Sequence, residues 1–94
     1  MSRELICGAI TKRSVISFFY TGSQRTVEPH ILGYDDSGDL TLSAWQVSGG
    51  SGQGWRDFHF DKMQAVALSG THFSDARPGY NPNDSTLMQI ICRL

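Results

Sequence analysis

The chain has 94 residues, of which 39% are hydrophobic and 18% are charged, and its formal net charge is −1 at pH 7. This length allows one small domain and leaves too little chain for a second independent core. The near-neutral charge excludes the overall basic footprint of a duplex-DNA-binding protein, although eight Lys and Arg residues could still form a local patch.

The N-terminal segment ELICGAITKR, residues 4–13, is expected to form a short amphipathic helix. Its residues Leu5, Ile6, Ala9 and Ile10 form one apolar stripe at helical spacing. Five short strands, bounded by turn residues, are expected after the helix, at 15–20, 25–34, 40–47, 55–60 and 63–70. This order predicts a mainly β fold, a small and strongly bent five-stranded antiparallel barrel.

The last segment, STLMQIICRL, allows two interpretations. Helical spacing of its apolar residues favours a C-terminal helix, and alternation of Met88, Ile90 and Cys92 would instead support a strand. We expect the helix. The segment before it, FSDARPGYNPND, is rich in turn residues and is expected to be a connector.

Cys7 and Cys92 are the two cysteines of the chain, and they lack CxxC spacing. The first residues, MSRELICGAI, are too short and too polar for a signal peptide, and no apolar run approaches the roughly 20 residues of a membrane span. We therefore expect reduced thiols in a soluble, cytoplasmic protein that does not contact membranes.

The stretch GGSGQGWRDFHF, residues 49–60, joins a glycine-rich segment to a strand that begins with an arginine. The glycines lack the strand-to-helix context of a phosphate-binding loop, so a flexible hairpin connection is expected. By strand alternation Arg56 shares a face with Phe58, and Arg25 shares a face with Val27. Two arginines at the rim of a barrel could hold a phosphate or a carboxylate bidentately. The alternative is that each pairs with an acid of this chain, such as Glu28, Asp57 or Asp61.

Aromatic residues and histidines are the other candidates for binding. Trp45 is expected on the polar face of its strand, where it could stack on a base, be covered by a guanidinium or pack against a terminal helix. Tyr20 ends the first strand and could donate its hydroxyl group to a ligand or close the core. His59 could contact a ligand or be solvated. The histidines and cysteines have no metal-ligand spacing, and Asp35, Asp36 and Asp39 are typical of a turn, so no metal site, cofactor or catalytic residue is predicted.

Several of these segments together resemble the WYL domain, a small Sm-like or SH3-like barrel found in prokaryotic transcription regulators. The resemblance covers roughly residues 3–73, which would be the core of a single domain spanning 1–94, with a tail at 74–94. It rests mainly on the strand ISFFY and on the segments RTVEP and RDFHFDKM. The sequence departs from the family pattern at Leu40-Thr41-Leu42, which stands in place of Trp-Tyr-Leu, and it lacks room for the usual winged helix-turn-helix.

The resemblance implies a ligand-sensing module without catalytic activity, which binds a nucleotide or single-stranded nucleic acid and signals to an effector protein. Carried over by position, the ligand-binding residues would be Tyr20, Arg25, Trp45, Arg56, His59 and Lys62. The alternative function is that of a structural protein, which self-associates through the edges of its barrel into a homo-oligomer. An enzyme is the reading that the sequence favours least.

Overall fold

One antiparallel sheet and one helix make up the computed structural model, which describes residues 3–94. The elements in chain order are α1 (Arg3–Lys12), β1 (Ser14–Tyr20), β2 (Ser23–Asp35), β3 (Leu40–Ser48), β4 (Gly54–His59), a 3-10 turn η1 (Phe60–Lys62), β5 (Gln64–His72) and β6 (Leu87–Arg93). The expected mainly β class is confirmed, as are the N-terminal helix and the first five strands.

The sheet has the strand order β4-β3-β2-β1-β5, and β6 pairs with β2 away from this path. β2 is long enough to serve two partners along one edge: residues 23–27 pair with β1, and residues 31–35 pair with β6. Within residues 3–94, the sheet does not close on itself, because β4 and β5 end the path without pairing with each other. The predicted five-stranded closed barrel is therefore corrected to a bent, open sheet of six strands.

The predicted C-terminal helix is wrong, because residues 87–93 form strand β6. The register pairs Leu32 with Cys92 and Gly33 with Ile90. The pairing of β2 with β1 ends at Val27. If no other strand paired with residues 31–35 of β2, their backbone N–H and C=O groups on this edge would be unpaired. Pairing with this edge outweighs the local helical spacing, which is a weak preference in comparison.

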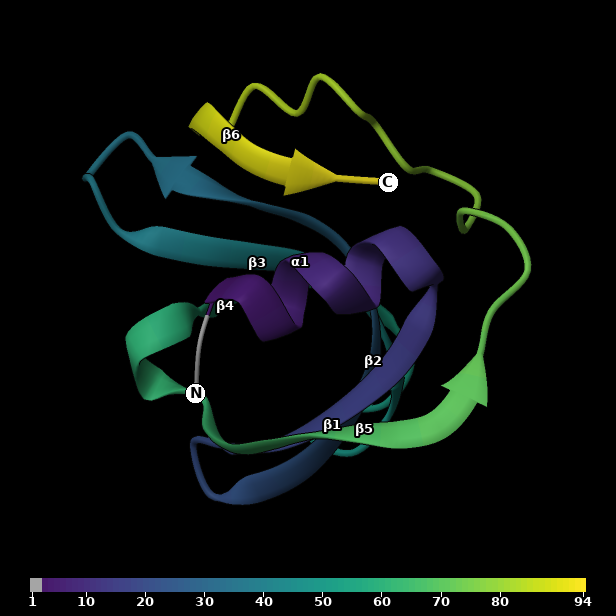
Figure 1. The fold of residues 1–94 in the computed structure, drawn as a ribbon. Helices are drawn as coiled ribbons and strands as arrows, with labels where there is room; N and C mark the ends of the chain where they lie inside the picture. The colour runs from purple at the N-terminus through teal and green to yellow at the C-terminus, as the bar shows by residue number, and fades with distance from the viewer. Residues whose placement is uncertain (1–2) are drawn as a thin grey trace.

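The hydrophobic core lies between α1 and the concave face of the sheet. α1 buries Ile6, Ala9 and Ile10, the stripe expected from the sequence. The core residues that they join include Phe18, Val27, Leu32, Leu42 and Phe58, each at most 1% exposed. Figure 1 shows the helix lying across the bent sheet, between β1 and β5 on one side and β3 and β6 on the other. Burying each large apolar side chain contributes about 1.5–3 kcal/mol.

A disulfide joins Cys7 of α1 to Cys92 of β6. The prediction of reduced thiols is therefore wrong, since the fold places together two cysteines that are 85 residues apart in the chain. The expectation of a cytoplasmic location rested in part on free thiols and loses that support. No helix in the described chain is long and apolar enough to cross a membrane.

Candidate functional site

The glycine-rich loop of residues 49–53 joins β3 to β4 in a hairpin, as expected, and Arg25 contacts it from β2. Nη1 of Arg25 donates to Oε1 of Gln46 at 3.0 Å. Its Nη2 donates to the carbonyl O of Tyr20 at 3.3 Å and to the hydroxyl of Thr21 at 3.0 Å. All of these acceptors are neutral, so they fix the guanidinium in place without compensating its charge.

Arg56 reaches the same loop from β4. Its Nη1 donates to the carbonyl O of Trp55 at 2.9 Å. Its Nη2 donates to Oγ of Ser51 at 2.9 Å and to the carbonyl O of Gly52 at 3.4 Å. As expected, Arg56 lies next to the buried Phe58, at the end of the core.

Gln46 connects the two arginines, and it is fully buried on the core face of β3. Its Oε1 accepts from Arg25, and its Nε2 donates to the carbonyl oxygens of Gly49 at 2.7 Å and Gly52 at 2.6 Å. The carbonyl of Gly52 also accepts from Arg56. Arg25 and Arg56 therefore converge on one loop, which the sequence alone left open.

Gly50 shows why this loop is rich in glycine. Its φ is 48°, in the left-handed region, and a Cβ at this position would overlap the guanidinium of Arg25. The glycine therefore allows the backbone to pack directly on the arginine. This part of the chain, the residues Arg25, Gln46, Arg56 and the loop 49–53, is called the arginine loop site below.

Within residues 3–94, neither Arg25 nor Arg56 forms an ion pair, so the predicted pairing with an acid of this chain is not found. Glu28, one of the acids considered, pairs instead with Arg77. The Nε–H group of Arg25 is buried and has no hydrogen-bond partner among the described residues. A buried donor without a partner is costly, because its interaction with water is lost without replacement. The arginine loop site thus combines two cations and one unpaired donor with neutral acceptors.

Tyr20 closes the core beside this site. Its ring makes an edge-on contact with Phe58 at 5.0 Å between centroids, and the guanidinium of Arg25 lies 5.7 Å from its ring centre. Its hydroxyl oxygen accepts a hydrogen bond from the backbone N–H of His59 at 2.9 Å. Of the two roles considered for Tyr20, closing the core is the one that these contacts fill.

Trp45 lies on the opposite face of the sheet and does not join the arginine loop site. The guanidinium of Arg77 lies 5.2 Å from its ring centre, and Trp55 makes an edge-on contact at 5.8 Å. Arg77 also binds Glu28 through two hydrogen bonds, Nε to Oε1 at 2.7 Å and Nη2 to Oε2 at 3.1 Å. A guanidinium, one of the partners considered from the sequence, therefore covers Trp45 in place of a ligand base.

His30 lies at the centre of the sheet face that carries Trp45. It was not among the site residues predicted from the sequence. It is fully buried, between Trp55 at 4.8 Å, Phe73 at 5.3 Å and Tyr80 at 5.1 Å. Its Nε2 accepts from the backbone N–H of Arg77 at 3.2 Å, which assigns the proton to Nδ1, the donor to the carbonyl O of Glu28 at 2.8 Å. Burial lowers the pKa of His30, so the neutral ring is the stable form.

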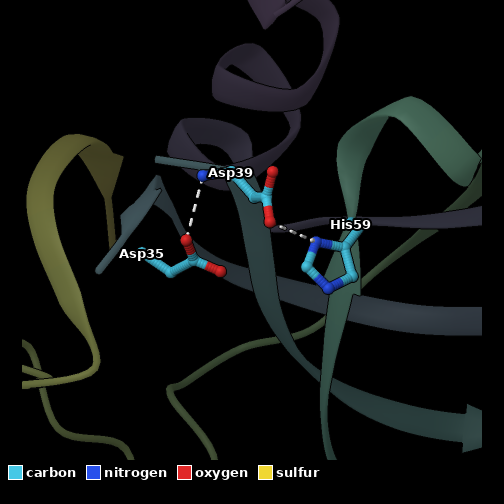
Figure 2. Close-up of side chains that lie close together, drawn as sticks. All are labelled: Asp35, Asp39 and His59. Carbon is cyan, nitrogen blue, oxygen red and sulfur yellow. Dashed lines mark hydrogen bonds and ion pairs between the residues drawn. The ribbon is translucent and has the colours of Figure 1, made fainter. Parts of the chain in front are cut away.

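His59 lies at a different place, at the end of β4 that faces the turn between β2 and β3. Its Nδ1 is 3.9 Å from Oδ2 of Asp39, and Asp35 lies beside them (Figure 2). The spacing of these residues in the sequence did not indicate a set of metal ligands. It is the pairing of β3 with β4, at Thr41 and His59, that brings Asp39 and His59 close together. Lys62 is exposed on η1, and among residues 3–94 it has no contact that would place it with the arginine loop site or with Asp39 and His59.

A cleft of about 430 Å³ opens beside His59 and is rich in acids. Its lining includes Asp35, Asp36, Asp57 and His59. Burial raises the pKa of Asp57, and the negative charge of Asp84 raises it further. The pKa of Asp35 is lowered, first by the hydrogen bond from the backbone N–H of Asp39. The structure therefore separates a cationic region, the arginine loop site, from an anionic cleft.

Comparison with known proteins yields no match to a protein-family model, to a curated protein or to a solved structure. The proposals below therefore rest on the residues of this chain and their geometry.

Proposed function

We propose that this protein is a non-catalytic binding module, similar in role to a WYL domain, that holds an anionic ligand at the arginine loop site. The observation that carries the proposal is the convergence of Arg25 and Arg56 on one loop, with no ion pair to either arginine in residues 3–94. Two guanidinium groups that share a site are suited to the oxygen atoms of phosphate groups.

The hydrogen bonds of the two arginines divide into an inner and an outer set. The inner bonds, to Gln46 and to the carbonyl of Trp55, are part-buried and hold the guanidinium groups in place. The outer bonds, to the hydroxyls of Thr21 and Ser51, are exposed. Exchanging a neutral hydroxyl for a phosphate oxygen replaces a bond from a cation to a neutral acceptor with a bond between opposite charges, so an anion can displace the outer set at little cost.

The ligand that we favour is a nucleotide or a short single-stranded nucleic acid, for which phosphate contacts supply most of the affinity. The proposed contact set is narrower than the six residues expected from the sequence. Trp45 is covered by Arg77 on the other face, and Tyr20 is engaged by His59 and Arg25. The phosphate groups would therefore be bound by Arg25 and Arg56, without an aromatic platform from Trp45.

Fluorescence anisotropy with a labelled short single-stranded DNA, with unlabelled nucleotides as competitors, tests this proposal at low salt. Arg25→Gln and Arg56→Gln should each weaken binding about tenfold or more, because one charge-assisted bond contributes about 1.5–3 kcal/mol. Arg93→Gln, which removes an exposed positive charge on β6, is the matched control and should stay within about twofold. Absence of binding, or equal binding by the Arg56→Gln protein, would disprove the proposal.

A second candidate function is self-association through β5, which a specific feature of the sheet favours. β5 ends the sheet and pairs with β1 alone among the described strands. It carries Leu68, which is 58% exposed, and Phe19 on the neighbouring strand is 40% exposed. A free strand edge beside exposed apolar residues can pair with a second chain. Sedimentation velocity tests this candidate: a dimer that Leu68→Lys dissociates supports it, and a monomer at all concentrations contradicts it.

A further inference from the structure

Three potential metal ligands lie together at the end of the sheet that faces the β2–β3 turn. Asp35 ends β2, Asp39 lies in the turn before β3, and His59 ends β4. One ligand atom from each of the three side chains lies within 4.8 Å of the other two. Figure 2 shows the carboxylate of Asp39 facing the imidazole of His59, with the carboxylate of Asp35 beside them.

The side chains of Asp39 and His59 are spaced so that one cation could bind to both. Their closest atoms, Oδ2 and Nδ1, are 3.9 Å apart, which is too far for a hydrogen bond. Two ligands at about 2.0–2.2 Å from one zinc ion lie roughly 3–3.6 Å from each other. Small side-chain rotations are therefore enough to bring both atoms to a shared cation. Within residues 3–94, neither the carboxylate of Asp39 nor the ring of His59 makes a hydrogen bond.

The backbone holds these side chains near one another without help from a ligand. Oδ1 of Asp35 accepts from the backbone N–H groups of Ser37 at 3.0 Å and Asp39 at 2.9 Å, while among the described residues Oδ2 accepts only a long hydrogen bond of 3.5 Å from the hydroxyl of Thr41. The backbone N–H of His59 donates to the hydroxyl of Tyr20. One oxygen of Asp35 thus orders the turn, and the other is left for a cation.

The adjoining cleft is a separate observation that favours a cation. It has a volume of about 430 Å³, and its lining includes three carboxylates, those of Asp35, Asp36 and Asp57, together with the imidazole of His59. Solvent can therefore reach Asp35 and His59 through the cleft, the side chain of Asp39 is itself 59% exposed, and the local charge attracts cations. The cleft also leaves room for water molecules to complete the coordination of an ion held by three protein ligands.

We propose that Asp35, Asp39 and His59 bind a divalent transition-metal cation of the zinc class. The combination of an imidazole nitrogen with two carboxylates is the reason for this class, because calcium and magnesium ions are bound by oxygen ligands. The site is distinct from the arginine loop site and does not depend on the function proposed for it. Both cysteines of the chain are in the disulfide, so no thiolate competes for the metal.

Isothermal titration calorimetry of the untagged full-length protein with ZnCl₂ tests the proposal, without reductant and at about pH 7.5. We expect one zinc ion per chain. His59→Ala and Asp39→Asn should each weaken binding about tenfold or more, because loss of even an outer-shell partner weakens metal sites about 10–100-fold. These two positions are chosen because, within the described residues, their side chains make no hydrogen bonds to the backbone, in contrast to Asp35.

Two variants serve as matched controls. His72→Ala removes an exposed histidine on β5, and Asp61→Asn removes an exposed negative charge on η1, two residues from His59. Both should bind zinc as the wild type does, within about twofold. The side-chain NMR resonances of His59 should shift on addition of zinc, which a purely structural role would not produce. No zinc binding, equal binding by the His59→Ala protein, or equally tight binding of Mg²⁺ would each overturn the proposal.

Discussion

His30 is a fully buried histidine that makes one hydrogen bond as a donor and one as an acceptor, both with its ring neutral. Protonation would place a charge among Trp55, Phe73 and Tyr80 and would remove the acceptor for the N–H of Arg77. Burial is the main reason that its pKa lies below the ordinary value of 6.5, and the charge of Arg77 acts in the same direction. Glu28, the other charged group beside it, acts in the opposite direction.

The lowered pKa of His30 predicts that stability decreases in mild acid. In the unfolded chain His30 takes up a proton near its ordinary pKa of 6.5, whereas in the folded chain it stays neutral to lower pH. Its contribution to stability is therefore fully present above about pH 6.5 and is lost as the pH falls through the folded pKa. NMR titration of the His30 ring should give a midpoint below 6.5, and a midpoint at or above that value would contradict this account.

Glu28 and Arg77 form an ion pair in which one partner is buried and the other is not. The side chain of Glu28 is 7% exposed, and that of Arg77 is 40% exposed. Removing Arg77 would leave the buried carboxylate without its two charge-assisted bonds, which is more costly than losing a surface pair. The ion pair also attaches the connector between β5 and β6 to the sheet, because Arg77 lies in this connector and its guanidinium covers Trp45.

At the scale of elements, strand β6 depends on a glycine in its partner strand. A Cβ at Gly33 would lie 2.6 Å from the carbonyl O of Gln89 and 3.1 Å from Cα of Ile90. Gly33→Ala should therefore push β6 away from β2 and destabilise the fold by about 1–3 kcal/mol, as overpacking does. Urea unfolding measures the loss, and hydrogen exchange should show the β6 amides exchanging faster.

Gly8 in α1 is the matched control for Gly33. Among the described residues, no atom beyond the backbone of α1 and the two neighbours of Gly8 lies within 4 Å of a Cβ added there, and its φ is not in the left-handed region. Gly8→Ala should stabilise the protein by about 1 kcal/mol, because alanine favours the interior of a helix. If the Gly33→Ala protein is as stable as the wild type, the tight approach of β2 and β6 is not a constraint on this fold.

The elements differ in how well local patterns predict them. Residues 3–72 follow local periodicity, because the apolar stripe of α1 and the alternation of β3 both face the core. Residues 87–93 carry both helical spacing and alternation, and the unpaired edge of β2, a partner more than 50 residues away, decides between the two. Local patterns also fail to predict the burial of Gln46. Its side chain is polar, but it is fully buried because it makes hydrogen bonds with the loop and with Arg25.

The candidate sites were likewise predictable from local sequence patterns only in part. Alternation along β4 places Arg56 beside Phe58 correctly, so the position of the arginines at the end of the core was predictable. Their convergence through Gln46 depends on how the loop folds, which no spacing encodes. Likewise, Asp39 and His59 come together only through the pairing of β3 with β4.

At the scale of the whole molecule, the disulfide between Cys7 and Cys92 ties the first element to the last. It links residues 85 positions apart, so it limits the unfolded chain strongly and should contribute roughly 4 kcal/mol of stability. A reducing agent should lower the thermal unfolding midpoint of the wild type. The Cys7→Ser, Cys92→Ser double variant should show the lower midpoint without reductant and no further change with it. An unchanged midpoint in the double variant would contradict this contribution.

The central claim, that anions bind at the arginine loop site, is tested most directly by NMR. The Nε–Hε resonances of Arg25 and Arg56 and the amides of residues 48–54 would be followed while a nucleotide or a short single-stranded DNA is added at low salt. We predict shifts that saturate and are largest at these positions, with Arg93 unaffected as an internal control. Shifts of the same size at all arginines, or shifts centred elsewhere on the sheet, would contradict the claim.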